Sequence, residues 1–183
     1  MIILISGATH TGKTLIAQKL LEKYKYPYLS IDHLKMGLIR SGNTELKPDS
    51  TFNQLTKYLW PIVREIIKTN IENHQHLIIE GCYIPHNYKK DFTELELSHI
   101  NMISIIFSEA YINKNYQHIL DYSSVIESRL YDEISKKRMI KENFANHLGC
   151  NKHHIRFIYV EEKYDIDLII EEISGLLSFS FYK

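Results

Sequence analysis

The stretch GATHTGKT, residues 7–14, decides which fold is expected for this chain. It matches the pattern G-x-x-x-x-G-K-[ST], in which backbone amides, a lysine and a hydroxyl group surround a phosphate. The flanking residues support the same interpretation. The apolar run Ile2–Ser6 predicts a buried strand before the stretch, and apolar residues at helical spacing from Thr14 onward predict a helix after it. A strand, a glycine-containing loop and a helix in this order predict a phosphate-binding loop.

Each position of the loop has a chemical reason. Gly7 and Gly12 permit backbone angles and a close approach that a side chain would prevent. The amides of residues 10–14 point at phosphate oxygens, and the amino-terminal end of the helix strengthens the attraction. Lys13 supplies a cation to the β- and γ-phosphates, and the hydroxyl of Thr14 is placed for Mg²⁺. The residues expected to bind ATP are therefore Gly7, His10, Thr11, Gly12, Lys13 and Thr14.

The composition is that of an ordinary globular protein. The chain has 183 residues, of which 44% are apolar and 24% charged, and this predicts one domain over residues 1–183. The 22 basic and 22 acidic residues balance, so no nucleic-acid partner is expected. No apolar run approaches about 18 residues and the first strand begins at Ile2, so we expect neither a membrane span nor a cleaved signal peptide. Two cysteines are too few for a disulfide framework, which fits a cytoplasmic location.

Short apolar runs alternate with helical patterns along the chain. The runs predict buried parallel strands at 2–6, 28–31, 77–80, 102–107 and 156–160. The clearest helical pattern covers about residues 51–73, where Thr51 and Gln54 have the spacing of a capping box and Pro61 is expected to kink or break the helix. A last helix is expected at about 165–177. This alternation predicts an α/β fold with helices on both faces of the sheet, whose ligands bind at the carboxyl ends of the strands.

The segment IDHLKMGLIRSG, residues 31–42, follows the second strand. Asp32 stands at the strand end, where a carboxylate accepts the proton of an acceptor hydroxyl or holds the metal. Asp32 also suits the cap of a helix, and the two roles are compatible. Lys35 and Arg40 follow as cations for a carboxylate or phosphate on the acceptor, with a solvent-exposed position as the alternative for each.

The segment IIEGCYIPH, residues 78–86, follows the third strand. Glu80 is the best candidate for a second acidic group near Mg²⁺, and Gly81 allows the acceptor to approach closely. Cys82 and Tyr83 either line the acceptor pocket or pack in the core. An hhhhD Walker B pattern is absent. The expected metal ligands are thus Thr14, Asp32 and Glu80.

Two further segments hold candidate residues. Residues 111–145 are rich in charge and are expected to form a lid that brings Arg129 or Arg138 to the transferring phosphoryl group, or else a solvated helix. The stretch HLGCNKHH, residues 147–154, places three histidines and a cysteine within metal-binding reach, but a polar loop contains the same residues, and both interpretations stay open.

Together, GATHTGKT, IDHLKMGLIRSG, IIEGCYIP and the basic lid-like segment resemble the small P-loop kinases of the adenylate- and shikimate-kinase type, over nearly the whole chain. The closest likeness is to bacterial proteins labelled 2-phosphoglycerate kinase or adenylate-kinase-like ATP-binding protein. The resemblance implies a P-loop NTPase fold, a three-layer α/β/α sandwich around a five-stranded parallel sheet in the order 2-3-1-4-5, with a small lid. It also implies that ATP and Mg²⁺ are the cofactors and that about residues 32–75 bind the acceptor.

The resemblance assigns roles to individual residues. Gly12, Lys13 and Thr14 hold phosphates and metal, and Asp32 is the base or an acid on the metal side. Arg40 anchors the acceptor, and Arg129 and Arg138 are the lid arginines. The usual pair of arginines that binds a nucleoside monophosphate has no obvious counterpart here, which argues against AMP as the acceptor.

The expected function is therefore an ATP- and Mg²⁺-dependent phosphotransferase that moves the γ-phosphoryl group to a small anionic metabolite such as 2-phosphoglycerate. The alternatives are a nucleoside-monophosphate kinase, a toxin-like kinase acting on nucleotide sugars, and an ATP-binding regulator without transfer activity. Balanced charge disfavours a polynucleotide kinase. The expected partners are ATP and a small-molecule acceptor, with the protein a monomer or homodimer.

Overall fold

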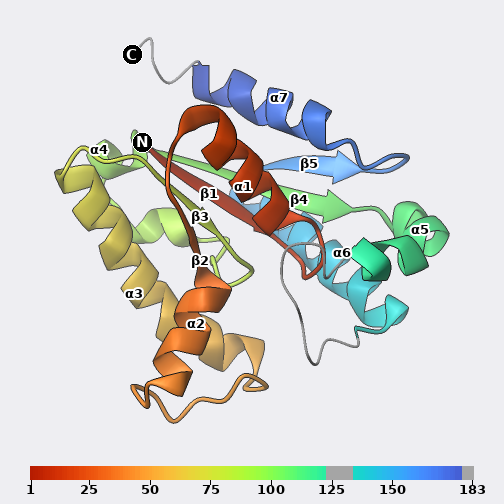
Figure 1. The fold of residues 1–183 in the computed structure, drawn as a ribbon, viewed down its shortest axis with the longest axis horizontal. Coiled ribbons are helices and arrows are strands. Elements are labelled where there is room, and N and C mark those ends of the chain that lie inside the picture. The colour runs from red at the N-terminus through yellow and green to blue at the C-terminus, as the bar shows by residue number, and fades with distance from the viewer. Residues whose placement is uncertain (123–133, 179–183) are drawn as a thin grey trace.

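The computed structural model of the chain describes residues 1–122 and 134–178 (Figure 1). Five parallel strands form one sheet in the order β2-β3-β1-β4-β5. The strands are β1 (Ile2–Gly7), β2 (Tyr28–Ser30), β3 (Leu77–Glu80), β4 (Ile100–Phe107) and β5 (Arg156–Val160). The expected fold class and strand order are confirmed.

Helices connect the strands. They are α1 (Lys13–Tyr24), α2 (Ile31–Arg40), α3 (Phe52–Glu72), α4 (Glu94–Leu97), α5 (Glu109–Tyr122), α6 (Lys136–His153) and α7 (Ile166–Ser178), with a short 3₁₀ helix η1 at Tyr88–Asp91. The capping box is confirmed, because the Thr51 hydroxyl accepts a hydrogen bond from the Gln54 amide at 3.4 Å and the Thr51 amide donates to Gln54 Oε1 at 3.1 Å.

The helix α3 does not break at Pro61, as the sequence had suggested it could. It continues through this exposed proline for 21 residues. The buried side chains of Leu59 and Val63 lie on either side of it and pack with the sheet. This packing holds the helix together although proline cannot donate a hydrogen bond to the preceding turn.

Alternating side chains of β1 divide the core between the two faces of the sheet. Ile3 and Ile5 are buried in a cluster with residues of α1 and α7. Ile2 and Leu4 are buried in a second cluster with residues of α3. The sheet is therefore the middle layer of a three-layer sandwich (Figure 1).

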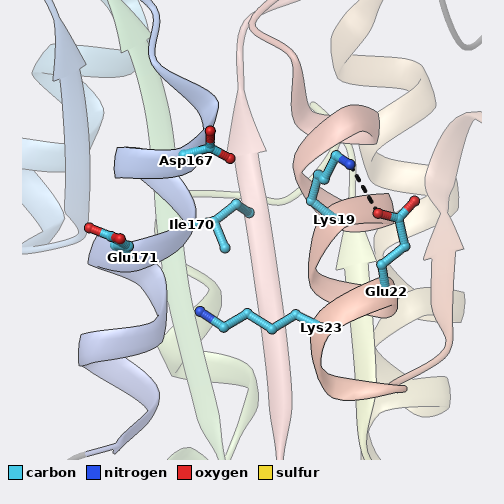
Figure 2. A pocket seen from close by; sticks show the side chains of 6 residues that line it. All are labelled: Lys19, Glu22, Lys23, Asp167, Ile170 and Glu171. Carbon is cyan, nitrogen blue, oxygen red and sulfur yellow. Dashed lines mark hydrogen bonds and ion pairs between the residues drawn. The ribbon is translucent and has the colours of Figure 1, made fainter.

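A shallow recess lies between α1 and α7 on the first of these faces (Figure 2). Its lining carries charges of both signs, and those on α1 are engaged in contacts. Lys19 pairs with Glu22 at 3.0 Å, and Lys23 donates a hydrogen bond to the Ser174 hydroxyl at 2.8 Å. The recess contains none of the expected site residues, so it belongs to the packing of α1 with α7.

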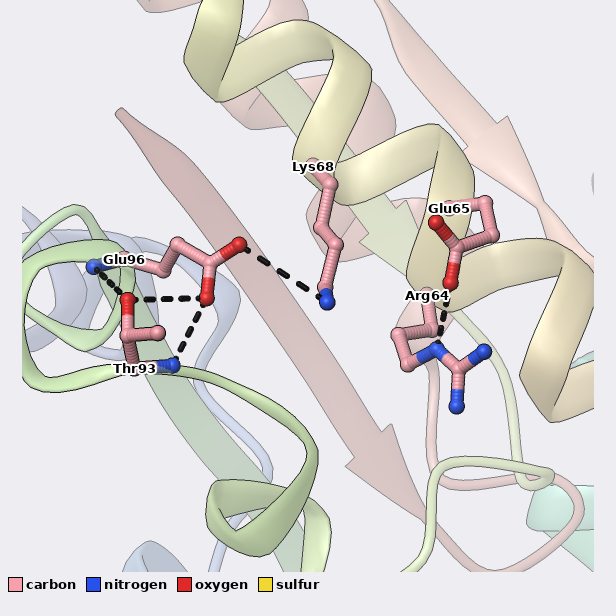
Figure 3. A network of polar contacts seen from close by, with 5 residues as sticks. All are labelled: Arg64, Glu65, Lys68, Thr93 and Glu96. Atoms are coloured by element: carbon pink, nitrogen blue, oxygen red, sulfur yellow. Dashed lines mark hydrogen bonds and ion pairs between the residues drawn. The ribbon is translucent and has the colours of Figure 1, made fainter.

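On the opposite face, polar contacts join α3 to α4 (Figure 3). Lys68 Nζ lies 3.8 Å from Glu96 Oε1. Glu96 also accepts a hydrogen bond from the Thr93 amide at 2.6 Å, which lowers the pKa of its carboxyl group. These contacts fix the turn that leads into β4. No helix of residues 1–122 and 134–178 is both long and apolar enough to cross a membrane.

Candidate phosphate-binding and acceptor site

The loop after β1 has the backbone shape of a phosphate cradle. Gly7 and Gly12 have φ angles of 143° and 78°, and His10 also has a positive φ of 65°. A Cβ atom at Gly7 would lie 2.5 Å from the carbonyl oxygen of Ile105, and one at Gly12 would collide with the hydroxyl of Tyr164. Only glycine fits either position, as the motif had suggested.

Lys13 is buried inside this loop. Its side chain is 6% exposed, and Nζ donates a hydrogen bond to the carbonyl of Ala8 at 2.7 Å. The Thr11 hydroxyl donates to the same carbonyl at 2.9 Å, so both side chains close the loop on itself. Within the described ranges no carboxylate pairs with Lys13. A buried ammonium group with a neutral partner keeps its charge available for an anion.

The start of α1 completes the cradle. Gly12 occupies the cap position, and no side chain caps the first turn. Lys13 and Thr14 are the first two residues of the helix, and Thr14 is half-buried. The first amides of a helix are unpaired within it and attract anions. The glycines, the uncapped amides and the buried lysine fit the phosphates of a nucleotide.

Asp32 and Lys35 form an ion pair in the first turn of α2. Lys35 Nζ lies 2.5 Å from Asp32 Oδ1 and donates a hydrogen bond to the Tyr83 hydroxyl at 3.2 Å. The cap position of α2 belongs to Ser30, so the interpretation of Asp32 as the cap is wrong. Asp32 instead lies within the first turn, where its negative charge favours the helix.

The side chain of Lys35 is 13% exposed, so the alternative of a solvent-exposed position for this residue is wrong. Its contact with an acceptor stays a prediction. The ammonium group lies over the ring of Tyr83, 5.2 Å from its centroid. Burial acts to lower the pKa of Lys35, but the charge of Asp32 and the hydrogen bond to it raise the pKa more. Lys35 therefore stays protonated and neutralises Asp32.

The end of β3 contributes a buried carboxylate. Glu80 is 2% exposed and pairs in register with Ile5 of β1 and Ser30 of β2. The following residue, Gly81, donates a backbone hydrogen bond to Ile5 at 3.1 Å. A Cβ atom at Gly81 would lie 2.8 Å from Cβ of Ile31, so the close approach that the structure shows here is that of α2. Contact of Gly81 with an acceptor stays a prediction.

The pKa of the Cys82 thiol is affected by several of the candidate site residues. Burial raises its pKa, and four charged residues act on it. Lys13 and Lys35 oppose the rise, whereas Asp32 and Glu80 add to it. Charged residues that follow β1 and β2 and the last residue of β3 therefore all lie near enough to Cys82 to act on its thiol at the carboxyl edge of the sheet. Their joint role in one site stays a prediction.

The expected arginines lie apart from this cluster or outside the described residues. Arg40 is exposed at the end of α2, about 12 Å along the helix from Asp32 and roughly 80° around it. Arg138 lies in the first turn of α6, is exposed, and pairs with Glu142 at 2.7 Å. Arg129 lies outside the described residues. The roles of all three arginines stay predictions.

The segment proposed as a lid comprises α5 and the first half of α6, with residues 123–133 outside the described part. Lys136 at the start of α6 lies 5.3 Å from the ring centroid of Tyr116 on α5 and 3.4 Å from the carbonyl of Asn113. The two helices are thus in direct contact.

The histidine-rich stretch does not form a metal cluster. His147 packs on the rings of Phe157 and Tyr159, whereas Cys150 is buried in the core. His153 faces His86, with ring centroids 6.3 Å apart. Throughout the described residues, no three side chains of the metal-binding types come together.

Tyr164 also borders the loop, although no motif in the sequence includes it. It lies between β5 and α7, and its hydroxyl touches the loop at Gly12. Nothing local to the sequence indicates this contact, because it depends on how the two ends of the chain meet.

Comparisons with known proteins identify the fold. No family model and no curated protein matches the sequence. Among solved structures, a gluconokinase from Sinorhizobium meliloti 1021 superposes with a TM-score of 0.60 at 14% identity, over 98% of this chain and 93% of that one. A shikimate kinase from Aquifex aeolicus vf5 gives 0.54 at 16% identity, over 100% and 99%. One from Bacteroides thetaiotaomicron gives 0.55 at 11%, over 97% and 98%. The chain shares the fold of these three proteins.

Proposed function

We propose that this protein is a small-molecule kinase that transfers the γ-phosphoryl group of ATP to a hydroxyl group of a small anionic metabolite. The observation that carries the proposal is the buried Lys13 in an uncapped glycine loop, together with the Asp32–Lys35 pair that follows β2 at the same edge of the sheet. The gluconokinase and shikimate kinases of the same fold support it. A cytoplasmic location is part of the proposal, and the use of ATP is consistent with it.

The donor half of the site is the loop. The amides of residues 10–14 and the ammonium group of Lys13 would hold the phosphates, with Lys13 exchanging its bond to Ala8 for one to a phosphate oxygen. The hydroxyl of Thr14 would hold Mg²⁺, with Asp32 and Glu80 as the acidic groups beside it. When bound, the metal ion neutralises charge on the transferring phosphoryl group.

The acceptor half is the Asp32–Lys35 pair. An acceptor hydroxyl facing Asp32 would give its proton to the carboxylate as its oxygen bonds to the γ-phosphorus and ADP leaves. Because the two charges are adjacent, an anionic group on the same molecule would reach Lys35. Lys35 is therefore proposed as an anchor together with Arg40. 2-Phosphoglycerate belongs to this class of acceptor, but no comparison favours it over other members.

The test of the donor site is a thermal shift with ATP and Mg²⁺. At ATP about 100-fold above Kd, the wild-type protein should gain about 2.7 kcal/mol, or roughly 5–10 °C in Tm. Lys13→Ala should lose most of this gain because the triphosphate loses its direct cation. Lys19→Ala, at an exposed lysine of the same helix, should retain it. An unchanged shift in Lys13→Ala would contradict the assignment of the loop as the donor site.

Phosphoryl transfer is then tested by ATP consumption across hydroxylated and phosphorylated metabolites, including AMP. Transfer to a small anionic acceptor is the expected result. Transfer to AMP alone would identify a nucleoside-monophosphate kinase instead, and ATP binding without transfer to any acceptor would identify a nucleotide-binding regulator.

A further inference from the structure

The hydroxyl group of Tyr164 meets the phosphate-binding loop from the far end of the chain. A Cβ atom added at Gly12 would collide with the hydroxyl oxygen and lie 2.9 Å from Cζ. The hydroxyl is buried and has no hydrogen-bond partner among the residues described. It is therefore a polar group aimed at the loop and unused by the protein itself.

The surroundings of Tyr164 hold this group in place. Its ring packs edge-on against Phe107, with centroids 5.8 Å apart. On one side, the carbonyl of Val160 accepts a hydrogen bond from the Ser108 amide at 2.9 Å, which ties the end of β5 to the end of β4. On the other side, Asp165 caps α7 by accepting from the Leu168 amide at 3.4 Å. The segment between these two points is short, which restricts where Tyr164 can lie.

The hydroxyl group of Tyr164 is protonated, so it is a hydrogen-bond donor that requires an acceptor. Burial raises the pKa of Tyr164, and the nearby Tyr111 raises it further, so the phenol stays protonated at neutral pH. A buried donor without an acceptor is unfavourable relative to one in water, and native structures rarely keep one without a reason. A phosphate chain lying along the amides that begin at Gly12 would bring the missing acceptor.

We propose that the hydroxyl of Tyr164 donates a hydrogen bond to a phosphate oxygen of the nucleotide held by the loop. The inference rests on the proposed function, since it takes the loop as the donor site. It extends that site to a residue of the segment between β5 and α7, which the loop motif does not include.

The test is Tyr164→Phe, which keeps the ring packing on Phe107 and removes only the hydroxyl. The Kd for ATP with Mg²⁺, measured by calorimetry, should rise about five- to thirtyfold. The Tm without nucleotide should stay the same or rise slightly, because a buried unpartnered group has been removed. Tyr88→Phe is the matched control, since this buried phenol lies in the other core cluster and its removal should leave the Kd unchanged.

Inorganic tripolyphosphate separates a phosphate contact from a nucleoside contact. Tyr164→Phe should weaken tripolyphosphate binding by a factor similar to that for ATP. A loss confined to ATP would place the hydroxyl against the base or ribose and overturn the proposal, as would a wild-type Kd for both ligands. Lys13→Ala in the same series identifies which idea has failed. If both Lys13→Ala and Tyr164→Phe bind ATP like the wild type, the assignment of the donor site is wrong. If Lys13→Ala loses ATP binding while Tyr164→Phe keeps it, only the role of Tyr164 is wrong.

Discussion

At the scale of single residues, the Asp32–Lys35 ion pair bears on the role of base that is proposed for Asp32. Lys35 bonds to Asp32 and to the Tyr83 hydroxyl, so the carboxylate is already neutralised before a substrate arrives. An acceptor that brings its own anionic group offers Lys35 a second partner. The approach of the acceptor would therefore free Asp32 at the place where a proton must be taken.

Asp32→Asn should reduce phosphoryl transfer by at least about 10²-fold, because the amide cannot take a proton or carry charge. The Kd for ATP should stay within about tenfold of the wild-type value, since the loop is unchanged. Steady-state rates and ATP calorimetry measure the two effects. Full activity of Asp32→Asn would reduce the residue to a partner of Lys35 within the first turn of α2.

Substitutions of the two proposed anchors should separate their roles. Lys35→Gln should raise the KM for the acceptor at least about tenfold and leave the KM for ATP nearly unchanged, because the change removes a charge from the acceptor side. Arg40→Lys keeps the positive charge and loses only the planar guanidinium group, so it should raise the KM for the acceptor by a smaller factor. If Arg40→Lys raises both constants equally or neither, Arg40 belongs to the exposed face of α2.

Which site residues could be found from the sequence depends on how local their contacts are. Lys13 lies within a continuous motif, and Asp32 and Lys35 are three residues apart on one helix, so both sets follow from short-range patterns. Tyr164 touches Gly12 only because β5 and β1 belong to the same sheet. A single sequence contains no signal for such a contact.

At the scale of elements, the sequence located the strands better than their ends. The expected start of the fourth strand at residue 102 is wrong, because Asn101 interrupts the apolar run. In the structure Ile2 pairs with Ile100, which extends β4 to this earlier residue. Likewise β2 ends at Ser30, because Ile31 already belongs to α2 and packs into the core. The first and last residues of a strand depend on the strands with which it pairs. The apolar pattern of a single strand contains no information about those neighbours.

The junction of β3 with α2 gives a testable contact. Gly81→Ala would place a Cβ atom 2.8 Å from Cβ of the buried Ile31, and this overpacking should lower the free energy of unfolding by about 1–3 kcal/mol. Gly37→Ala is the matched control, because nothing lies within 4 Å of its Cβ and it sits inside α2. It should stabilise by up to about 1 kcal/mol through helix propensity. Urea unfolding measures both, and equal effects would contradict the contact.

At the scale of the whole molecule, the segment after β3 joins the two halves of the sheet. His86 lies in this segment and packs against α6, which covers β4. A Cβ atom at Gly149 of α6 would lie 2.5 Å from the His86 ring, so a larger residue here would force the ring to move. His153 of the same helix stacks on His86. The contact therefore connects elements that are distant in the sheet order.

Acid should weaken this connection. Burial lowers the pKa of His86 below 6.5, and the charge of His153 lowers it further, against a hydrogen bond with Asn146. The unfolded chain therefore binds the proton more readily, so stability should fall as the pH drops through about 6.5 toward the folded pKa. His86→Gln should flatten the decline in Tm between about pH 7.5 and 5.5. His99→Gln, at an exposed histidine before β4, should leave the slope unchanged. Equal slopes in the two variants would show that the decline has another source.

The central place of β1 also governs the order of events during synthesis. Ile2 pairs with both Leu77 and Ile100, so the strand that ends in the phosphate-binding loop is the first made and among the last enclosed. At about 5–20 residues per second, the ribosome needs roughly 5–20 s to reach β4 after β1 has been translated. During that interval the nascent chain carries an apolar strand that lacks at least one of its two neighbours. Chaperone capture of the nascent chain should therefore be strongest before residue 107 has emerged.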